Sequence, residues 1–118
     1  MYEIKIHSDF SAAHNLRNYR GKCENLHGHN WKIEAVFVYK TLDKDGLAVD
    51  FKEVKGLLKK TLEKLDHCYL NETGVFKKTN PTSENIARYI YEDINKNNKN
   101  IFSVSVWENE NSCATYKE

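Results

Sequence analysis

Cysteine and histidine side chains gather in the segment K-C-E-N-L-H-G-H-N-W, residues 22–31. Imidazole nitrogens and thiolate sulfur are ligands for divalent transition metals, zinc above all. His27 and His29 could therefore bind a metal ion. Cys23 could be a further ligand that closes a structural site, or a base beside an open site, because a metal and nearby imidazoles would lower its pKa and favour the thiolate. The spacing leaves both roles of Cys23 open.

A third histidine joins this pair through the pattern of the strands that must position it. Residues 2–14 alternate between apolar and polar side chains, which predicts a half-buried strand with Ile6 and Phe10 facing inward. His14 is even-numbered like these two residues, so it should also point inward. Residues 29–40 alternate in the same way, which predicts a second strand, antiparallel to the first.

The inward side of this second strand is odd-numbered, since it carries Trp31 and Ile33. His27 and His29 share that numbering, and the end of one antiparallel strand lies beside the start of the next. We therefore expect His14, His27 and His29 to converge, leaving a fourth metal position for water or substrate. His7 falls on the opposite face and is expected to be an ordinary histidine.

The rest of the chain predicts two helices and two more strands. Apolar residues recur at three- and four-residue intervals after Asp50 and again after Pro81, which predicts two amphipathic helices. Residues 101–108 and 113–117 form two further strands around an N-E-N-S turn. The order β-β-α-α-β-β predicts an α+β fold with a four-stranded antiparallel sheet, both helices on one face, and a single domain over residues 1–118.

Composition narrows the possible partners. Lys and Arg total 18 against 17 Asp and Glu, which argues against a nucleic-acid partner held by bulk charge. The sequence lacks a secretory h-region and an apolar run long enough for a bilayer, so we expect a soluble, cytoplasmic protein without a membrane partner. The odd number of cysteines, 3, argues against a disulfide framework. At 118 residues, the chain could need neighbouring subunits to enclose an active site.

Three other places could serve a site. Asp66 and His67 are adjacent and could form a proton relay, or lie apart in a surface loop. Glu108 ends the apolar face of a strand, where it could bind a ligand with an amidine-like N–H pair or simply face water. P-T-S-E-N, which contains Thr82 and Glu84, could be only a helix start, or its exposed N–H groups could meet a ligand.

Six segments together resemble the 6-pyruvoyl-tetrahydropterin synthase family, in the same order and over nearly the whole chain. The cysteine four residues before H-G-H is most similar to the bacterial 6-carboxy-5,6,7,8-tetrahydropterin synthases of queuosine biosynthesis. The segments are F-S-A-A-H at 10–14, C-E-N-L-H-G-H-N at 23–30, V-D-F at 49–51, L-D-H-C-Y-L-N at 65–71, P-T-S-E-N at 81–85 and V-W-E at 106–108.

This resemblance implies the tunnelling fold (T-fold), in which the sheets of several subunits join into a barrel. Two trimers commonly stack into a homohexamer with active sites at subunit interfaces. Glu108 and the region of Thr82 and Glu84 could then serve a site whose metal belongs to a neighbour. The resemblance also implies one Zn²⁺ per subunit, a cytoplasmic location and a pterin triphosphate as the small-molecule substrate.

The resemblance assigns a role to each candidate residue. The metal ligands are His14, His27 and His29; the catalytic base is Cys23; the proton relay is Asp66 with His67. Glu108 anchors the amino-pyrimidine edge of the pterin, with further contacts from Thr82 and Glu84. The implied activity is that of a lyase that converts 7,8-dihydroneopterin triphosphate to 6-carboxytetrahydropterin, acetaldehyde and triphosphate, with zinc as a Lewis acid and Cys23 and His67 moving protons.

Several alternatives remain beside this activity. Glu24 gives the pattern E-x-x-H-G-H, and related enzymes of folate synthesis use a glutamate near this place to release 6-hydroxymethyl-dihydropterin, so a dual or shifted product is credible. Another alternative is a synthase that forms 6-pyruvoyl-tetrahydropterin. A non-catalytic zinc module would use Cys23 as a fourth ligand, but it would not need Asp66, His67 or Glu108. A metal-dependent hydrolase would need a carboxylate placed as in H-E-x-x-H enzymes, which the sequence does not offer.

Overall fold

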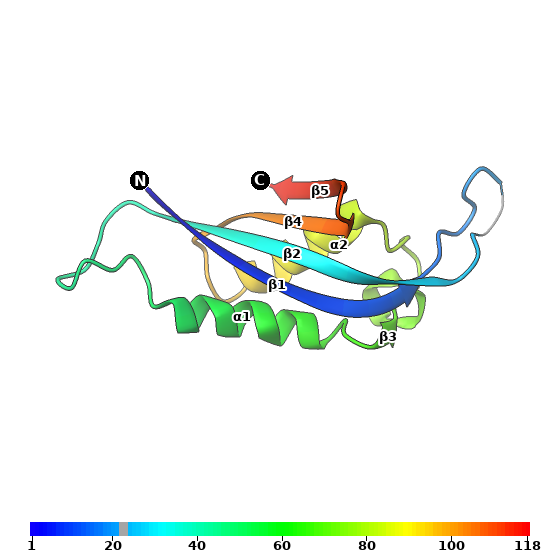
Figure 1. Cartoon of the computed structure of the whole chain (residues 1–118), viewed down its shortest axis with the longest axis horizontal. Coiled ribbons are helices and arrows are strands. Elements are labelled where there is room, and N and C mark those ends of the chain that lie inside the picture. Colours follow the sequence, from blue (N-terminus) through cyan, green and yellow to red (C-terminus); the bar gives the residue numbers. More distant parts are fainter. Residues whose placement is uncertain (22–23) are drawn as a thin grey trace.

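Two long strands form the frame of the fold in the computed structural model, which describes residues 1–21 and 24–118 (Figure 1). A two-layer arrangement follows, because the apolar face of the sheet packs against the buried sides of both helices in one core. The elements are β1 (Tyr2–His14), β2 (His27–Tyr39), α1 (Phe51–Glu63), β3 (Cys68–Tyr69), α2 (Ser83–Asn95), β4 (Ile101–Asn109) and β5 (Ser112–Lys117), with 3₁₀ turns at Leu70–Glu72 and Gly74–Phe76.

The sheet has the strand order β3-β1-β2-β4-β5. Neighbours are antiparallel except β3, which pairs parallel to β1 through Ala12 with Cys68 and Ala13 with Tyr69. The expected four-stranded antiparallel sheet is therefore a five-stranded mixed sheet. The sequence pattern missed β3 because two residues are too short to show alternation.

The register between β1 and β2 sets the positions of the histidines. Phe10 lies opposite Trp31, Ala12 opposite His29, and His14 opposite His27. Directly opposed residues of an antiparallel pair face the same side of the sheet, so all three histidines lie on the core side. The predicted inward direction of His14 is confirmed, since only 2% of this residue is exposed.

Two β-bulges alter β4. Val36 pairs with Ser103 and Phe37 with Ile101, so Phe102 is an extra residue; it is 39% exposed, although strand alternation predicts it inward. Against β5, Trp107 pairs with Cys113 and Asn109 with Ser112, which leaves Glu108 as the extra residue. A bulge bends its strand and redirects the side chain that it carries.

Both helices begin where the sequence predicts, after Asp50 and after Pro81. The Asp50 carboxylate accepts a hydrogen bond from the Lys52 backbone N–H, and the Thr82 hydroxyl accepts one from the Asn85 N–H. The apolar stripes are buried as expected, except that Phe51, the first residue of α1, is exposed.

None of the helices in residues 1–21 and 24–118 combines the length and apolar character that crossing a membrane requires. The cytoplasmic location stays a prediction.

Candidate metal centre

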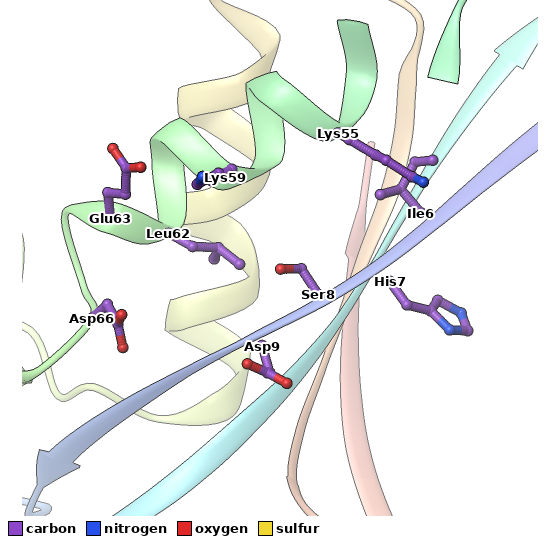
Figure 2. Close-up of a pocket in the computed structure, with 9 residues that line it drawn as sticks. All are labelled: Ile6, His7, Ser8, Asp9, Lys55, Lys59, Leu62, Glu63 and Asp66. Carbon is purple, nitrogen blue, oxygen red and sulfur yellow. The ribbon is translucent and has the colours of Figure 1, made fainter. Parts of the chain in front are cut away.

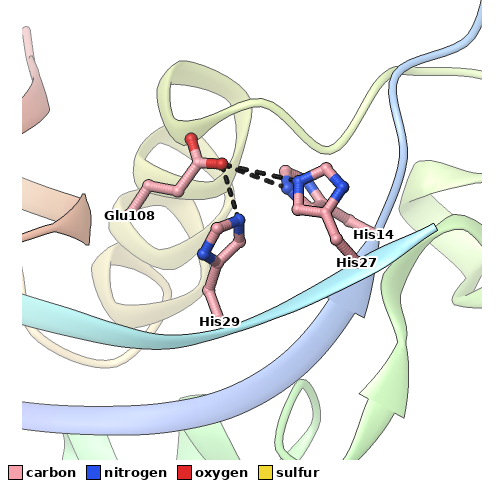
Figure 3. A group of neighbouring side chains, drawn as sticks. All are labelled: His14, His27, His29 and Glu108. Atoms are coloured by element: carbon pink, nitrogen blue, oxygen red, sulfur yellow. Dashed lines mark ion pairs between the residues drawn. The ribbon is translucent and has the colours of Figure 1, made fainter. Parts of the chain in front are cut away.

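Three histidines converge at the end of the sheet where β1 ends and β2 begins (Figure 3). The ring centroids of His14 and His27 are 4.6 Å apart, those of His27 and His29 are 4.8 Å apart, and those of His14 and His29 are 5.4 Å apart. With Glu108, each residue offers one ligand atom, and these atoms all lie within 4.8 Å of one another. This group could hold a metal ion, as the spacing and strand pattern predict for the histidines.

Backbone carbonyl groups orient two of the rings. Nδ1 of His14 lies 2.8 Å from the carbonyl oxygen of Pro81, and Nδ1 of His27 lies 2.8 Å from that of Asn25. A carbonyl oxygen can only accept a hydrogen bond, so Nδ1 of each ring carries the proton. In the neutral form, Nε2 of both rings therefore presents a lone pair, which is the arrangement of a metal-ligating histidine.

Two of the ε nitrogens have no hydrogen-bond partner. Nε2 of His14 and Nε2 of His29 are buried and unpartnered among the described residues. Glu108 Oε1 lies 2.8 Å from the latter atom, but without the alignment of a hydrogen bond. Leaving buried nitrogens unpartnered costs free energy, and a metal ion would satisfy both. Three imidazole nitrogens and a carboxylate oxygen also form a donor set that suits zinc.

The surroundings keep His29 neutral. Burial lowers its pKa below the ordinary value of 6.5, and the neighbouring His27 and His14 lower it further, while Glu108 acts in the opposite direction. Trp31 packs edge-on against His14 and His29, with ring centroids 4.8 and 5.3 Å away, and it is fully buried. The neutral imidazole that metal binding requires is therefore the favoured form of His29.

Glu108 occupies a place that the sequence did not predict. Its Oε1 lies 2.8 Å from Nε2 of His29, 3.4 Å from that of His14 and 3.7 Å from that of His27 (Figure 3). The even-numbered face of β4 predicted that Glu108 points inward, but not that it meets the histidines of its own chain. The expectation that Glu108 serves a neighbour's metal therefore needs correction.

Glu108 also lines a small pocket of about 180 Å³ with Ser83, Glu84 and Cys113. The structure thus brings together two of the residues predicted to bind a ligand, Glu84 and Glu108. Thr82 lies two residues before Glu84 as the N-cap of α2, where its hydroxyl accepts a hydrogen bond from the Asn85 N–H.

The residues before His27 are described in part. Glu24 Oε1 accepts a hydrogen bond from the Leu16 N–H at 3.2 Å and lies 3.8 Å from Nε2 of His27. A carboxylate therefore borders the histidines from this side as well. Cys23, the predicted base, lies outside the described residues.

The side chains of Asp66 and His67 contact each other, as the predicted proton relay requires. His67 Nδ1 lies 3.0 Å from Asp66 Oδ2. The Ser11 N–H donates to Asp66 Oδ1 at 2.9 Å, and the His67 N–H donates to the Ser11 carbonyl at 2.6 Å. The Ser11 hydrogen bond, followed by the positive field of His67, lowers the pKa of Asp66 although desolvation opposes this. His67 has a φ of 56°, a strained value for a non-glycine residue, and its side chain is 83% exposed.

The outer edge of β1 holds this pair. Asp66 lines a pocket of about 340 Å³ between β1 and α1, together with Ser8 and Lys59 (Figure 2). Neither Asp66 nor His67 belongs to the candidate metal group found among the described residues. Within one chain, the predicted relay is therefore separate from the histidines.

Sequence reasoning missed two asparagines that hold the segment leading to Glu24. The Asn71 side chain accepts from the Asn15 N–H at 3.0 Å and donates to the Asn15 carbonyl at 2.7 Å. The Asn80 side chain does the same with Arg17, at 2.8 and 3.0 Å. The side chain of each asparagine thus satisfies both the N–H and the carbonyl group of one residue of the segment, as a neighbouring strand would. The only signal in the sequence is their position: Asn71 ends the segment L-D-H-C-Y-L-N, and Asn80 directly precedes P-T-S-E-N.

Known proteins are similar to this chain over nearly all of its length. The family model described as 6-pyruvoyl tetrahydropterin synthase matches residues 3–118. The 6-carboxy-5,6,7,8-tetrahydropterin synthase of Haemophilus influenzae is 30% identical over 141 aligned positions, covering 100% of both proteins. Its namesake from Synechocystis is 33% identical over 122 positions, covering 98% of this chain and 93% of the relative.

A solved structure agrees with these sequence matches. The 6-pyruvoyl tetrahydropterin synthase of Caenorhabditis elegans superposes with a TM-score of 0.88 at 28% identity, covering 99% of this chain and 95% of the other. The same architecture is thus present, from β1 through β5. This chain belongs to the 6-pyruvoyl tetrahydropterin synthase family.

Proposed function

We propose that the protein is a zinc-dependent 6-carboxy-5,6,7,8-tetrahydropterin synthase of queuosine biosynthesis. It converts 7,8-dihydroneopterin triphosphate and one water molecule to 6-carboxytetrahydropterin, with release of acetaldehyde and triphosphate. The convergence of three imidazoles with their ε nitrogens directed at one point carries the proposal. The names of the relatives at 30% and 33% identity support the choice of product.

His14, His27 and His29 would hold the zinc ion. Bound there, zinc supplies Lewis acidity toward the oxygens of the substrate side chain. The two buried, unpartnered ε nitrogens support this assignment, because a metal ion is a partner that they lack among the described residues.

The pocket beside Glu108 would receive the pterin ring. A carboxylate can accept two parallel N–H groups, so Glu108 would bind the amino-pyrimidine edge. Glu84 lines the same pocket. The Thr82 hydroxyl accepts one hydrogen bond as the helix cap and retains its own hydrogen for donation to the ligand.

Cys23 would act as the base, and His67, oriented by Asp66, would move a second proton. Because Asp66 and His67 lie at the edge of β1 and apart from the histidines, they would serve the centre of a neighbouring subunit. This arrangement requires an oligomer with interfacial sites, such as a homohexamer built from two trimers.

A second product has support from one observation. Glu24 Oε1 lies 3.8 Å from Nε2 of His27, so a carboxylate borders the centre near the expected place of the base. A glutamate base would favour 6-hydroxymethyl-dihydropterin instead of the 6-carboxy product.

The test is to incubate the purified, zinc-loaded protein with 7,8-dihydroneopterin triphosphate and to identify the products by mass. We expect 6-carboxytetrahydropterin together with acetaldehyde. Formation of 6-hydroxymethyl-dihydropterin alone would overturn the proposed product, and an unchanged substrate would overturn the proposed activity.

A further inference from the structure

The carboxylate of Glu108 completes the donor set of the candidate metal centre. Its Oε1 lies within 3.7 Å of all three histidine ε nitrogens, and no other carboxylate of the described chain joins this group. Three imidazole nitrogens and one carboxylate oxygen are enough for a closed, four-coordinate zinc site. As it stands in the structure, Glu108 is therefore placed as a metal ligand.

This placement conflicts with the second role of the same side chain. To bind the paired N–H groups of an amino-pyrimidine, a carboxylate presents both of its oxygens outward. Oε1 of Glu108 instead points at the histidines (Figure 3). The same side chain also lines the pocket shared with Glu84 and Cys113. The two arrangements exclude each other, so Glu108 can serve both roles only by exchanging between them.

The surroundings of Glu108 permit such a movement. Glu108 is the extra residue of the bulge between β4 and β5, and its side chain is 35% exposed. None of the described residues donates a hydrogen bond to its carboxylate, whereas His14 and His27 are each held by a hydrogen bond through Nδ1. Ligands are normally held in place by such outer contacts, so Glu108 is the member of the group that is free to leave.

We propose that Glu108 is an exchangeable fourth metal ligand. It binds the metal when the pocket is empty of ligand, and it turns to the N–H pair of a pterin when one enters. The centre is thereby closed at rest and gains an open position only when a ligand is bound. The pterin half of this inference rests on the proposed function, and the metal half does not.

Cobalt(II) provides the test, because its visible absorption reports the coordination of the ion in the protein. The added probe is pterin itself, which lacks the side-chain hydroxyls of the substrate. We expect Glu108→Ala to bind Co²⁺ at least about tenfold more weakly. Loss of a residue that only hydrogen-bonds to a metal ligand already lowers metal affinity about 10- to 100-fold, and loss of a ligand should cost no less. We also expect saturating pterin to shift the wild-type spectrum toward that of Glu108→Ala.

Glu110→Ala is the matched control, because Glu110 lies in the turn just beyond β4 and is absent from the metal group. Its Co²⁺ affinity and spectrum should equal those of the wild type. A Glu108→Ala variant with wild-type affinity and spectrum would overturn the role of Glu108 as a ligand. A wild-type spectrum that saturating pterin leaves unchanged would overturn the exchange.

Direct binding of pterin to the metal would also overturn the exchange, and it would appear as an equal shift in Glu108→Ala. Failure of the proposed function gives a different result. In that case 7,8-dihydroneopterin triphosphate yields no product, while Glu108→Ala still alters the Co²⁺ affinity and spectrum.

Discussion

Two backbone carbonyl groups decide which nitrogen each ring presents to a ligand. The oxygens of Pro81 and Asn25 accept from Nδ1 of His14 and His27, so their ε nitrogens face the centre. The residues that supply these carbonyls lie just before α2 and just before β2. The nitrogen that each of these two histidines presents to a metal ion therefore depends on where α2 and β2 begin.

Substitution of the predicted base separates the two roles that the sequence left open for Cys23. With three histidines and Glu108 already grouped, a metal ion needs no thiolate ligand. We expect Cys23→Ala to abolish turnover and to keep a full complement of zinc. Metal analysis of the purified variant, beside its activity, checks this. Loss of zinc would instead support a structural site in which Cys23 is a ligand.

Strand alternation and the antiparallel pairing of the first two strands predicted the convergence of the histidines. Alternation fixes the face of the sheet on which each side chain lies, and the register fixes which residues are opposite: His14 lies opposite His27, and Ala12 opposite His29. The same reasoning predicted that Glu108 points inward but could not place it beside the histidines, because that depends on the register of β4 against β2. The alternation of one strand does not report which distant strand pairs with it, or at which residues.

At the scale of elements, the segment between β1 and β2 depends on Asn71 and Asn80. Asn71 is 7% exposed, and its side chain satisfies both the N–H and the carbonyl group of Asn15. Asn71→Ala leaves these two groups without partners, which costs about 1–3 kcal/mol in the free energy of unfolding. Urea unfolding should show this loss, and turnover should fall because the segment leads to Cys23 and Glu24.

Asn111→Ala is the control for this change. Asn111 is exposed in the turn between β4 and β5, and it donates a hydrogen bond to Asn109 Oδ1 through its backbone N–H. The expected effect is within about 0.5 kcal/mol. Equal effects of Asn71→Ala and Asn111→Ala would contradict a holding role for Asn71.

Asp93 joins the two helices through a charge that depends on pH. Its carboxylate accepts hydrogen bonds from Thr61 at 2.8 Å and from Lys64 at 3.0 and 2.9 Å. Burial alone would raise the pKa of Asp93, but the hydrogen bonds from Lys64 and Thr61 outweigh it and hold the pKa below the ordinary 3.8. A lowered folded-state pKa means that the contribution is present above 3.8 and is lost as the pH falls through the folded value.

Asp93→Asn should therefore lower the free energy of unfolding at pH 7 by about 1 kcal/mol, a modest value because Lys64 is half exposed and solvent screens the pair. The difference from the wild type should shrink in urea unfolding at a pH below the folded-state pKa. A difference of the same size at both pH values would show that the charge of Asp93 is not its cause.

Periodicity and caps predicted most of the elements, since Asp50 and Thr82 cap the helices as their positions indicate. Two of the failures share one cause. β3 is recognisable only through its pairing with Ala12 and Ala13, and the exposure of Phe102 only through its extra place opposite β2. Both depend on residues distant in the sequence, which local periodicity does not report.

At the scale of the whole molecule, the position of Asp66 and His67 bears on assembly. They lie at the outer edge of β1, where β3 pairs with Ala12 and Ala13 and the Asp66–His67 pair bonds Ser11. Before Ser11, no strand of the described residues pairs with this edge. An open strand edge favours pairing with another chain. If that chain is another copy, the Asp66–His67 pair would lie at a subunit interface, as the proposed arrangement requires.

Mixing two inactive variants tests this arrangement. Cys23→Ala and His67→Ala subunits should each be inactive alone and should regain part of the activity after joint unfolding and reassembly, because some sites then combine an intact Cys23 with an intact His67. Product formation measures the recovery, and the mass of the mixed oligomer in solution is the control. Mixed oligomers without any recovery would place both residues of a site in one chain.

Removal of the metal tests the central claim most directly. The protein is treated with a chelator, its metal content is measured, and product formation from 7,8-dihydroneopterin triphosphate is followed before and after zinc is restored. We expect metal content and 6-carboxytetrahydropterin formation to fall together and to return together, because His14, His27 and His29 leave their ε nitrogens for a metal ion. Undiminished product formation by the metal-free protein would contradict the account.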